Sequence, residues 1–313
     1  MEIILENMDE LERILLNTLA REKLLPDGAR VTAAVSGGAD SVAMAHLLKT
    51  LAPARGWELD ILHVNHRARS GSDGDQEFVE RLASELSLPF RAVALEPGGS
   101  AGEREWSAAR QCIYEACPGL VAVAHSRDDR AETLLLRLCE GAGLRGLGGM
   151  DYRGRGPVRR PMLDMGREGI RSWLRSRDIQ WREDPTNNDA GMARNRMRLQ
   201  VLPVLEDAFP GSVEGICRSS AVLSGWRDLQ DALGELLPEL SIKRREFLEL
   251  PDAVASLALW QMAGRPRTGF QELAKVLKWL QGGGNGEHLL PGGRRLTADR
   301  EGIRVTERGP GRY

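Results

Sequence analysis

The sequence of 313 residues predicts an α/β fold, in which a doubly wound parallel sheet is followed by a smaller α+β domain. Two observations predict the sheet. Short apolar runs alternate with amphipathic stretches of helical length, and this alternation builds βαβ units. Polar residues gather where the runs end, at the carboxyl edge where such sheets bind ligands. The predicted strands cover residues 31–36, 59–64, 89–95 and 120–124.

Apolar residues at helical spacing predict the helices that cover this sheet. They are expected over residues 8–23, 42–51, 72–86, 103–116 and 167–177. Chemically distinctive motifs become sparse after residues 209–211, and two helices and several short strands are expected beyond that turn. We therefore expect one domain over residues 1–210 and a smaller one over 211–313.

Composition predicts a soluble, cytoplasmic protein. Hydrophobic residues make up 42% of the chain, and the acidic N-terminus lacks the layout of a signal peptide. No apolar run approaches the roughly 18 residues that span a bilayer. The cysteines lack CxxC spacing, which favours reduced thiols over a disulfide framework. They are Cys112, Cys117, Cys139 and Cys217.

The net charge of −2 by itself argues against a nucleic-acid partner, but its distribution along the chain does not. Between Gly143 and Arg198 there are 13 Arg, no Lys and 7 acidic residues, a local charge of +6. An arginine-rich stretch on a nearly neutral chain predicts a surface that contacts phosphate backbone. Solvated helix faces are the alternative explanation of these arginines.

The motif SGGADS, from Ser36 to Ser41, follows the first predicted strand and opens a helix. Free N–H groups at a helix N-terminus, flexible glycines and hydroxyl donors together favour phosphate. Asp40 lies beside this cradle. A carboxylate and a phosphate repel each other unless a cation lies between them, so we expect Mg²⁺ there. The motif lacks the Lys of a Walker A loop.

A second cluster, AHSRDDRAET, follows the fourth predicted strand. His125 ends that strand, and Asp128, Asp129 and Glu132 lie on the first turns of a helix. Carboxylates that share a helix face repel one another, so the cluster predicts a cation, either Mg²⁺ or an amine substrate. Asp128 is expected mainly to cap the helix.

Three further segments carry weaker signals. Residues 141–161 are too rich in Gly for a regular element and predict a flexible, phosphate-gripping loop that leads to a short strand near Val158. The turn EDPTN precedes a helix that opens with Arg194, Asn195, Arg196 and Arg198. Local pattern alone favours Arg110 as an ordinary surface arginine.

Together these motifs resemble the tRNA(Ile)-lysidine synthetases, within the N-type ATP-pyrophosphatases. The likeness covers about two-thirds of the chain, and LLPGGRRL continues it more weakly. SGGADS alone indicates only an ATP-pyrophosphatase. AHSRDDRAET followed by EDPTN is what distinguishes the tRNA(Ile)-lysidine synthetases from the other ATP-pyrophosphatases. The matching segments are SGGADS, HVNHRAR, the helix with Arg110, AHSRDDRAET, GAGLRGLGGM, RRPML, EDPTN, RNRMR and VLPVL.

The resemblance implies a two-step reaction on an isoleucine tRNA with a CAU anticodon. ATP adenylates the carbonyl oxygen at carbon 2 of the wobble cytidine and releases pyrophosphate. The ε-amine of L-lysine then displaces AMP and leaves lysidine. The implied cofactors are ATP and Mg²⁺, and the sequence leaves a homodimer open.

The resemblance also implies roles for individual residues. Nucleotide binding is implied for Ser36, Gly37, Gly38, Ala39, Asp40, Ser41, His63 and Arg110. Catalysis is implied for Asp40, His125, Asp129 and Glu132, with Asp40 and Asp129 as metal ligands. Contacts to tRNA are expected from Arg145, Arg159, Arg160, Arg194, Asn195, Arg196 and Arg198.

Two departures from the family pattern stand out. Glu140 precedes the glycine-rich loop where the family often has a basic residue. No long third domain is expected, as in the shorter form of the family, and the tRNA contacts then come from fewer surfaces.

The sequence leaves three alternative functions open. A tRNA thiolase uses the same adenylation but usually needs paired cysteines. A non-catalytic tRNA-binding relative would have no need of the complete carboxylate set. A small-molecule amide-forming synthetase would not explain the arginine-rich segment.

Overall fold

The computed structural model describes residues 8–65, 72–95, 103–183, 191–236, 241–266 and 270–306. The chain divides into two compact units. The first unit ends at Val222, and the second contains the residues from Leu223 on together with 143–145. This division falls inside helix α11 (Ser212–Leu236). The boundary expected at residue 210 precedes that helix and stays a prediction.

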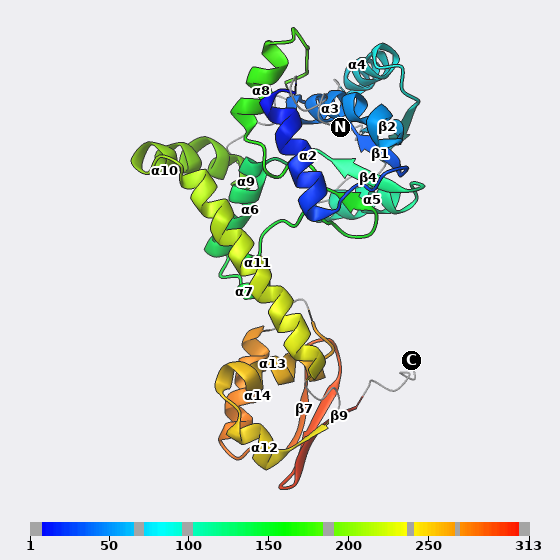
Figure 1. Cartoon of the computed structure of the whole chain (residues 1–313). Coiled ribbons are helices and arrows are strands. Elements are labelled where there is room, and N and C mark those ends of the chain that lie inside the picture. Colours follow the sequence, from blue (N-terminus) through cyan, green and yellow to red (C-terminus); the bar gives the residue numbers. More distant parts are fainter. Residues whose placement is uncertain are drawn as a thin grey trace. The chain divides into compact units, whose positions relative to one another are not determined.

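The first unit is built on a five-stranded sheet in the order β3-β2-β1-β4-β5, of which Figure 1 labels β2, β1 and β4. Every neighbouring pair is parallel, and the first strand in sequence lies at the centre. The chain therefore winds outward in both directions, which confirms the predicted fold class. The strands are β1 (Arg30–Ala34), β2 (Glu58–Asn65), β3 (Phe90–Ala94), β4 (Leu120–Val123) and β5 (Val158–Arg159).

All five helices expected over this unit are present. They are α2 (Glu10–Glu22), α3 (Ala39–Arg55), α4 (Ser72–Glu85), α5 (Glu103–Glu115) and α8 (Arg167–Arg175). The others are α6 (Arg127–Cys139), α7 (Leu144–Leu147), α9 (Ala193–Arg196), the π-helical η2 (Met197–Val201) and α10 (Leu202–Ala208). Among the helices that the structure describes, none is long and apolar enough to cross a membrane.

The core of the first unit forms around β1 and α3. Val31 and Ala33 of the strand and Leu47 and Leu48 of the helix are fully buried. A central parallel strand is covered on both faces, so Val31, Thr32 and Ala33 are buried in succession without alternation. Trp173 of α8 belongs to the same core cluster. The loop between β1 and α3 is thus held at both ends by packed elements.

The second unit has an α+β architecture, as predicted. Its antiparallel sheet has the order β6-β9-β8-β7. The strands are β6 (Ser241–Lys243), β7 (Gly286–Leu289), β8 (Arg295–Ala298) and β9 (Gly302–Thr306). The helices are α12 (Arg244–Glu249), α13 (Asp252–Met262) and α14 (Phe270–Gln281). The sequence did not indicate α13, because nearly all of its residues are small or apolar and show no helical periodicity.

The glycine-rich segment differs from the flexible loop that we expected. It contains the short helix α7, and Arg137 Nη1 donates to the carbonyls of Gly146, at 2.7 Å, and Gly149, at 2.6 Å. Ser220 Oγ donates to Gly148 O at 3.0 Å. Gly149 has a φ of +74°, and a Cβ there would lie 2.3 Å from Ser220 Oγ. Glycine here allows close packing rather than mobility.

Arg244 anchors the second unit. Its buried guanidinium donates to the carbonyls of Leu280 at 3.0 Å, Gly284 at 2.8 Å and Asp299 at 3.1 Å, and to Asn285 Oδ1 at 3.1 Å. We predict that Arg244→Met destabilises this unit by about 3 kcal/mol, because buried oxygens lose a charged donor. Hydrogen exchange of the β8 and β9 amides measures the loss.

The adjacent Arg245 provides the control. Its side chain is 90% exposed and pairs with Glu249 at 3.0 Å. Arg245→Met should change the stability by less than about 0.5 kcal/mol. Equal exchange rates in the two variants would contradict the anchoring role of Arg244.

Candidate active site

The loop from Ser36 to Ser41, called the phosphate cradle below, is held in shape by hydrogen bonds from the hydroxyl groups of its own serines. Ser41 Oγ accepts the N–H of Ser36 at 3.1 Å and donates to Gly38 O at 2.9 Å. Gly37 has a φ of +95°, a backbone conformation that favours glycine. The N-cap residue of α3 is Gly38, which has no side chain to accept the first N–H groups of the helix. The helix itself begins at Ala39. The first N–H groups of α3 therefore remain available to an anion.

His63 braces the strand that leads into this cradle. Its Nδ1 lies 2.9 Å from Val35 O, and a carbonyl can only accept, so Nδ1 carries the proton. Burial lowers the pKa of His63, and the imidazole is neutral at pH 7. His63 thus contacts the residue before Ser36, and its expected contact with nucleotide stays a prediction.

The start of α6 corrects the expected capping. Asp129, not Asp128, accepts the N–H of the N-cap residue Ser126 at 2.8 Å and its hydroxyl at 3.0 Å. Asp128 instead accepts the N–H of Arg167 at 2.8 Å, at the first residue of α8. The reason is spacing, since a carboxylate three residues after the N-cap can reach back to the N-cap N–H.

Asp129 and Glu132, here called the carboxylate pair, are buried and surrounded by three arginines. Arg167 lies 3.1 Å from Asp129 and 3.2 Å from Glu132. Arg194 makes the same two contacts at 3.0 and 2.9 Å. Arg198 makes them at 3.4 and 2.8 Å. We call these residues the arginine trio.

The arginine trio supplies the cations that the acidic cluster requires. Burial raises the pKa of Asp129, but the charges of Arg194 and Arg167 outweigh it and lower that pKa to about 2. Within the described part of the chain, no three His, Cys, Asp or Glu side chains gather to hold a metal. The expected metal contact of Asp129 stays a prediction.

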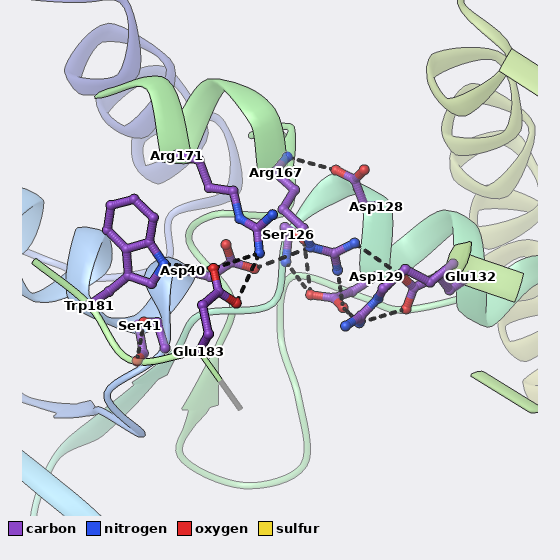
Figure 2. Close-up of polar contacts among 12 residues, drawn as sticks. Asp40, Ser41, Ser126, Asp128, Asp129, Glu132, Arg167, Arg171, Trp181 and Glu183 are labelled. Atoms are coloured by element: carbon purple, nitrogen blue, oxygen red, sulfur yellow. Dashed lines mark hydrogen bonds and ion pairs between the residues drawn. The ribbon is translucent and has the colours of Figure 1, made fainter. Parts of the chain in front are cut away.

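Arg167 also joins the carboxylate pair to the phosphate cradle. Its Nε lies 3.9 Å from Asp40 Oδ2, and Figure 2 shows the guanidinium between Asp40 and Asp129. Burial raises the pKa of Asp40 to about 6, and the charges of Asp129 and Asp128 add to the effect while Arg167 opposes it. A further cation beside Asp40 would stabilise the ionised form of its carboxylate, which burial disfavours. Mg²⁺ fits this requirement.

His125 lies beside this cluster. Arg160 Nε donates to its Nδ1 at 3.1 Å, so the proton of the neutral imidazole is on Nε2. Burial lowers the pKa of His125 to about 4, and Arg160, Arg194 and Arg110 lower it further while Asp129 opposes them. Arg110, on α5, is therefore close enough to His125 for their charges to interact.

The residues expected to contact tRNA do not share one orientation. Arg194 and Arg198 point into the carboxylate pair, Asn195 is buried and Arg196 is exposed. Arg159 donates to the carbonyls of Gly156, at 3.0 Å, and Val158, at 2.9 Å. Arg160 donates to Asp151 O at 2.8 Å as well as to His125. Arg145 lies in α7, and its side chain falls outside the described part.

Two parts of the expected site lie outside the described residues. They are the end of HVNHRAR, from His66 on, and residues 184–187 of EDPTN. Sequence reasoning missed Arg167 and Arg171, which lie one turn apart on α8. Their spacing of four residues was a usable signal, because it places both side chains on one helix face.

The sequence matches the PP-loop domain family over residues 8–205, and the chain belongs to this family. The match covers the sheet, the phosphate cradle, the carboxylate pair and the arginine trio. The family match and the candidate site thus fall in the same part of the chain.

Curated relatives are named tRNA(Ile)-lysidine synthase. The protein of Symbiobacterium thermophilum is 33% identical and aligns over 89% of this chain and 65% of its own length. The protein of Thermus thermophilus is 34% identical over 90% of this chain and 58% of its own length. The chain therefore spans about three-fifths of the length of these relatives.

The fold is shared with a solved structure, the U34-tRNA thiolase NcsA from Methanococcus maripaludis with its [4Fe-4S] cluster. The TM-score is 0.59 at 19% identity, over 69% of this chain and 78% of the thiolase. At this identity the likeness concerns the fold alone.

We predict that His125→Asn flattens the pH dependence of stability. The pKa of His125 is about 4 in the folded protein and 6.5 as its ordinary value, so the unfolded chain binds the proton first as pH falls. Wild-type stability therefore decreases through this window. Between pH 7 and pH 4.5 the wild type should lose about 2 kcal/mol more than the variant.

Urea unfolding at the two pH values measures the difference. Asn keeps an acceptor for Arg160, so the variant retains that hydrogen bond. Parallel pH profiles for the two proteins would show that His125 titrates normally in the folded state.

Proposed function

We propose that this chain ligates L-lysine to carbon 2 of the wobble cytidine of an isoleucine tRNA with a CAU anticodon. ATP would be cleaved to AMP and pyrophosphate in the process. The observation that carries the proposal is the position of Arg167, which contacts Asp40, Asp129 and Glu132. One guanidinium thereby joins a phosphate cradle and a pair of buried carboxylates in one site. The names of the curated relatives support the same reaction.

The cradle is the proposed site of the ATP triphosphate. The N–H groups at the start of α3 would donate to phosphate oxygens, and the hydroxyl groups of Ser36 and Ser41 would fix the loop around them. Asp40 and Asp129 are the residues that would hold Mg²⁺, which commonly takes one or two carboxylates beside phosphate oxygens and water. When bound, the ion would neutralise charge on the departing pyrophosphate.

We propose that the lysine amine reacts beside the carboxylate pair, where a carboxylate oxygen would accept a hydrogen bond from the uncharged amine and orient it. The pair's charge of −2 is exceeded by the three guanidiniums of the arginine trio, so the cluster keeps a positive excess. We propose that this excess also stabilises the phosphate of the adenylated cytidine and of AMP. His125, neutral at pH 7, would donate a hydrogen bond from Nε2 without adding charge.

The proposed tRNA surface includes Arg196 and the strand end at Arg159. Arg196 is the exposed arginine of the RNRMR segment, because Arg194 and Arg198 are turned into the carboxylate pair. Exposed arginines position phosphate backbone without reading the sequence. The second unit is proposed to add contacts to the tRNA stem.

A tRNA thiolase is the second candidate, favoured by the structural likeness alone. The cysteines do not favour it. Cys117 and Cys217 are buried, and Cys112 and Cys139 are exposed on different helices. Burial raises the pKa of Cys217 to about 11, which makes its thiolate scarce at pH 7.

The decisive experiment incubates the protein with ATP, Mg²⁺, radiolabelled lysine and an unmodified transcript of the CAU-anticodon isoleucine tRNA. We expect label to enter the tRNA in amounts that depend on ATP. A transcript with a different wobble base should stay unlabelled. Failure of a folded protein to transfer label would reject the proposed reaction, and transfer of sulfur from a donor would favour the thiolase.

We predict that Asp40→Asn reduces the rate of label transfer at least about a hundredfold, because the carboxylate proposed beside the departing pyrophosphate is lost. The variant keeps the size of the side chain, and circular dichroism checks its fold. A matched control is Asp178→Asn, at an exposed turn after α8. Similar loss in both variants would point to a general effect of charge.

We predict that Arg196→Ala weakens tRNA binding about three- to tenfold and makes its salt dependence shallower by about one phosphate contact. Filter binding at several salt concentrations measures both quantities. Arg81→Ala, at an exposed position of α4, is the matched control and should change neither. Unchanged binding in Arg196→Ala would move the tRNA surface elsewhere.

A further inference from the structure

Residues 181–183 lie on the phosphate cradle. The N–H of Arg182 donates to Gly37 O at 2.9 Å, which fixes this segment to the first glycine of the loop. The Arg182 side chain covers the same glycine, since its Cγ lies 3.7 Å from where a Gly37 Cβ would be. Arg182 Nε also pairs with Asp75 of α4 at 3.2 Å. The segment is thus held by its backbone and by a neighbouring helix.

The next residue, Glu183, forms an ion pair at the edge of the cradle. Its carboxylate accepts from Arg171 Nη2 at 3.2 and 3.3 Å and from Trp181 Nε1 at 2.9 Å. Figure 2 shows the side chains of Arg171 and Glu183 meeting beside Asp40, with Ser41 in the same region. An acidic side chain therefore stands where the proposed triphosphate would be repelled by it.

The two arginines of α8 differ in how firmly they are held. Arg167 is 16% exposed and lies within 4 Å of three carboxylates. Arg171 is 34% exposed, and its partner Glu183 is 62% exposed. Exposed ion pairs contribute little to stability, so Arg171 can change partner at small cost. Its Nε has no hydrogen-bond partner among the described residues, which leaves donor capacity unused.

We infer that Arg171 is a phosphate-binding residue that Glu183 holds in place until nucleotide arrives. On binding, the guanidinium would exchange the Glu183 carboxylate for phosphate oxygens of the nucleoside triphosphate. A planar guanidinium binds phosphate through two parallel hydrogen bonds, which makes the exchange favourable. The inference rests on the proposed function, because it assumes that the cradle binds a nucleoside triphosphate.

Charge around Asp40 supports this assignment. The Arg171 guanidinium lowers the pKa of Asp40, which places its charge within reach of the first turn of α3. Arg167, Asp129 and Asp128 are the other groups that act on that carboxylate. Loss of the Glu183 partner would leave Arg171 as a mobile cation next to the cradle.

A purely structural ion pair makes a different prediction. If Arg171 and Glu183 only fixed residues 181–183, removal of either side chain would loosen the cradle, and both variants would bind nucleotide more weakly. Exchange of partners predicts opposite signs instead. Loss of Arg171 removes a phosphate ligand, whereas loss of the Glu183 charge removes a competitor of phosphate.

The test measures the affinity of the full chain for α,β-methylene-ATP with Mg²⁺ by titration calorimetry. We expect Arg171→Gln to weaken binding about tenfold and Glu183→Gln to tighten it about threefold. In the Arg171→Gln background, Glu183→Gln can relieve only the direct repulsion between this carboxylate and the triphosphate, so the effects of the two substitutions should not be additive. Arg175→Gln is the matched control. Arg175 lies one turn further along α8, pairs with Glu168 at 2.9 Å and should leave the affinity unchanged.

The outcomes separate two failures. If the wild type does not bind the nucleotide, the proposed function fails. If the wild type binds and Arg171→Gln binds equally well, only the role of Arg171 is overturned. Weaker binding by both single variants would likewise overturn the exchange and assign the pair a structural role. Thermal melts of each variant confirm that it is folded.

Discussion

The buried carboxylate pair of Asp129 and Glu132 is the constraint on which the first unit depends. A carboxylate that is removed from water without a partner destabilises the fold by several kcal/mol. Three guanidiniums meet this need, and they come from α8, α9 and η2. Elements far apart in the sequence are therefore forced to converge on the start of α6, directly beyond the end of β4.

The same constraint couples the two halves of the site. Arg167 pairs with both carboxylates of the pair and lies within 4 Å of Asp40. A change of charge at the cradle therefore alters the electrostatic potential at the start of α6. Arg171, one turn further along α8, has an exposed and exchangeable partner. One helix thus presents a fixed arginine and an exchangeable one. This combination suits a site that must keep its shape while charged substrates enter and leave.

Much of the fold and of the candidate site could be predicted because the sequence motifs that indicate them each span only a few residues. SGGADS and AHSRDDRAET each combine a strand end with a helix start, and both lie at the carboxyl edge of the sheet as expected. The errors came from partners distant in sequence. Asp128 was expected to cap α6, but it accepts the N–H of Arg167 at the start of α8, which folding brings to it. The glycine-rich segment was expected to be flexible, but Arg137 and Ser220 hold it by hydrogen bonds. Helix α13 was not predicted, because an apolar helix buried in a core shows no alternation of apolar and polar residues at helical spacing.

The sequence by itself determined the alternation of strands and helices that builds the parallel sheet and the position of the glycine loop and the acidic cluster at its edge, because hydrophobic periodicity and helix-terminus chemistry act over a few residues. Only the tertiary structure decided which cations neutralise the acidic cluster. The sequence suggested a metal or an amine substrate, whereas the fold brings Arg167, Arg194 and Arg198 within hydrogen-bond distance of it. Ion pairing acts through space, and the distances that govern it exist only once the chain has folded.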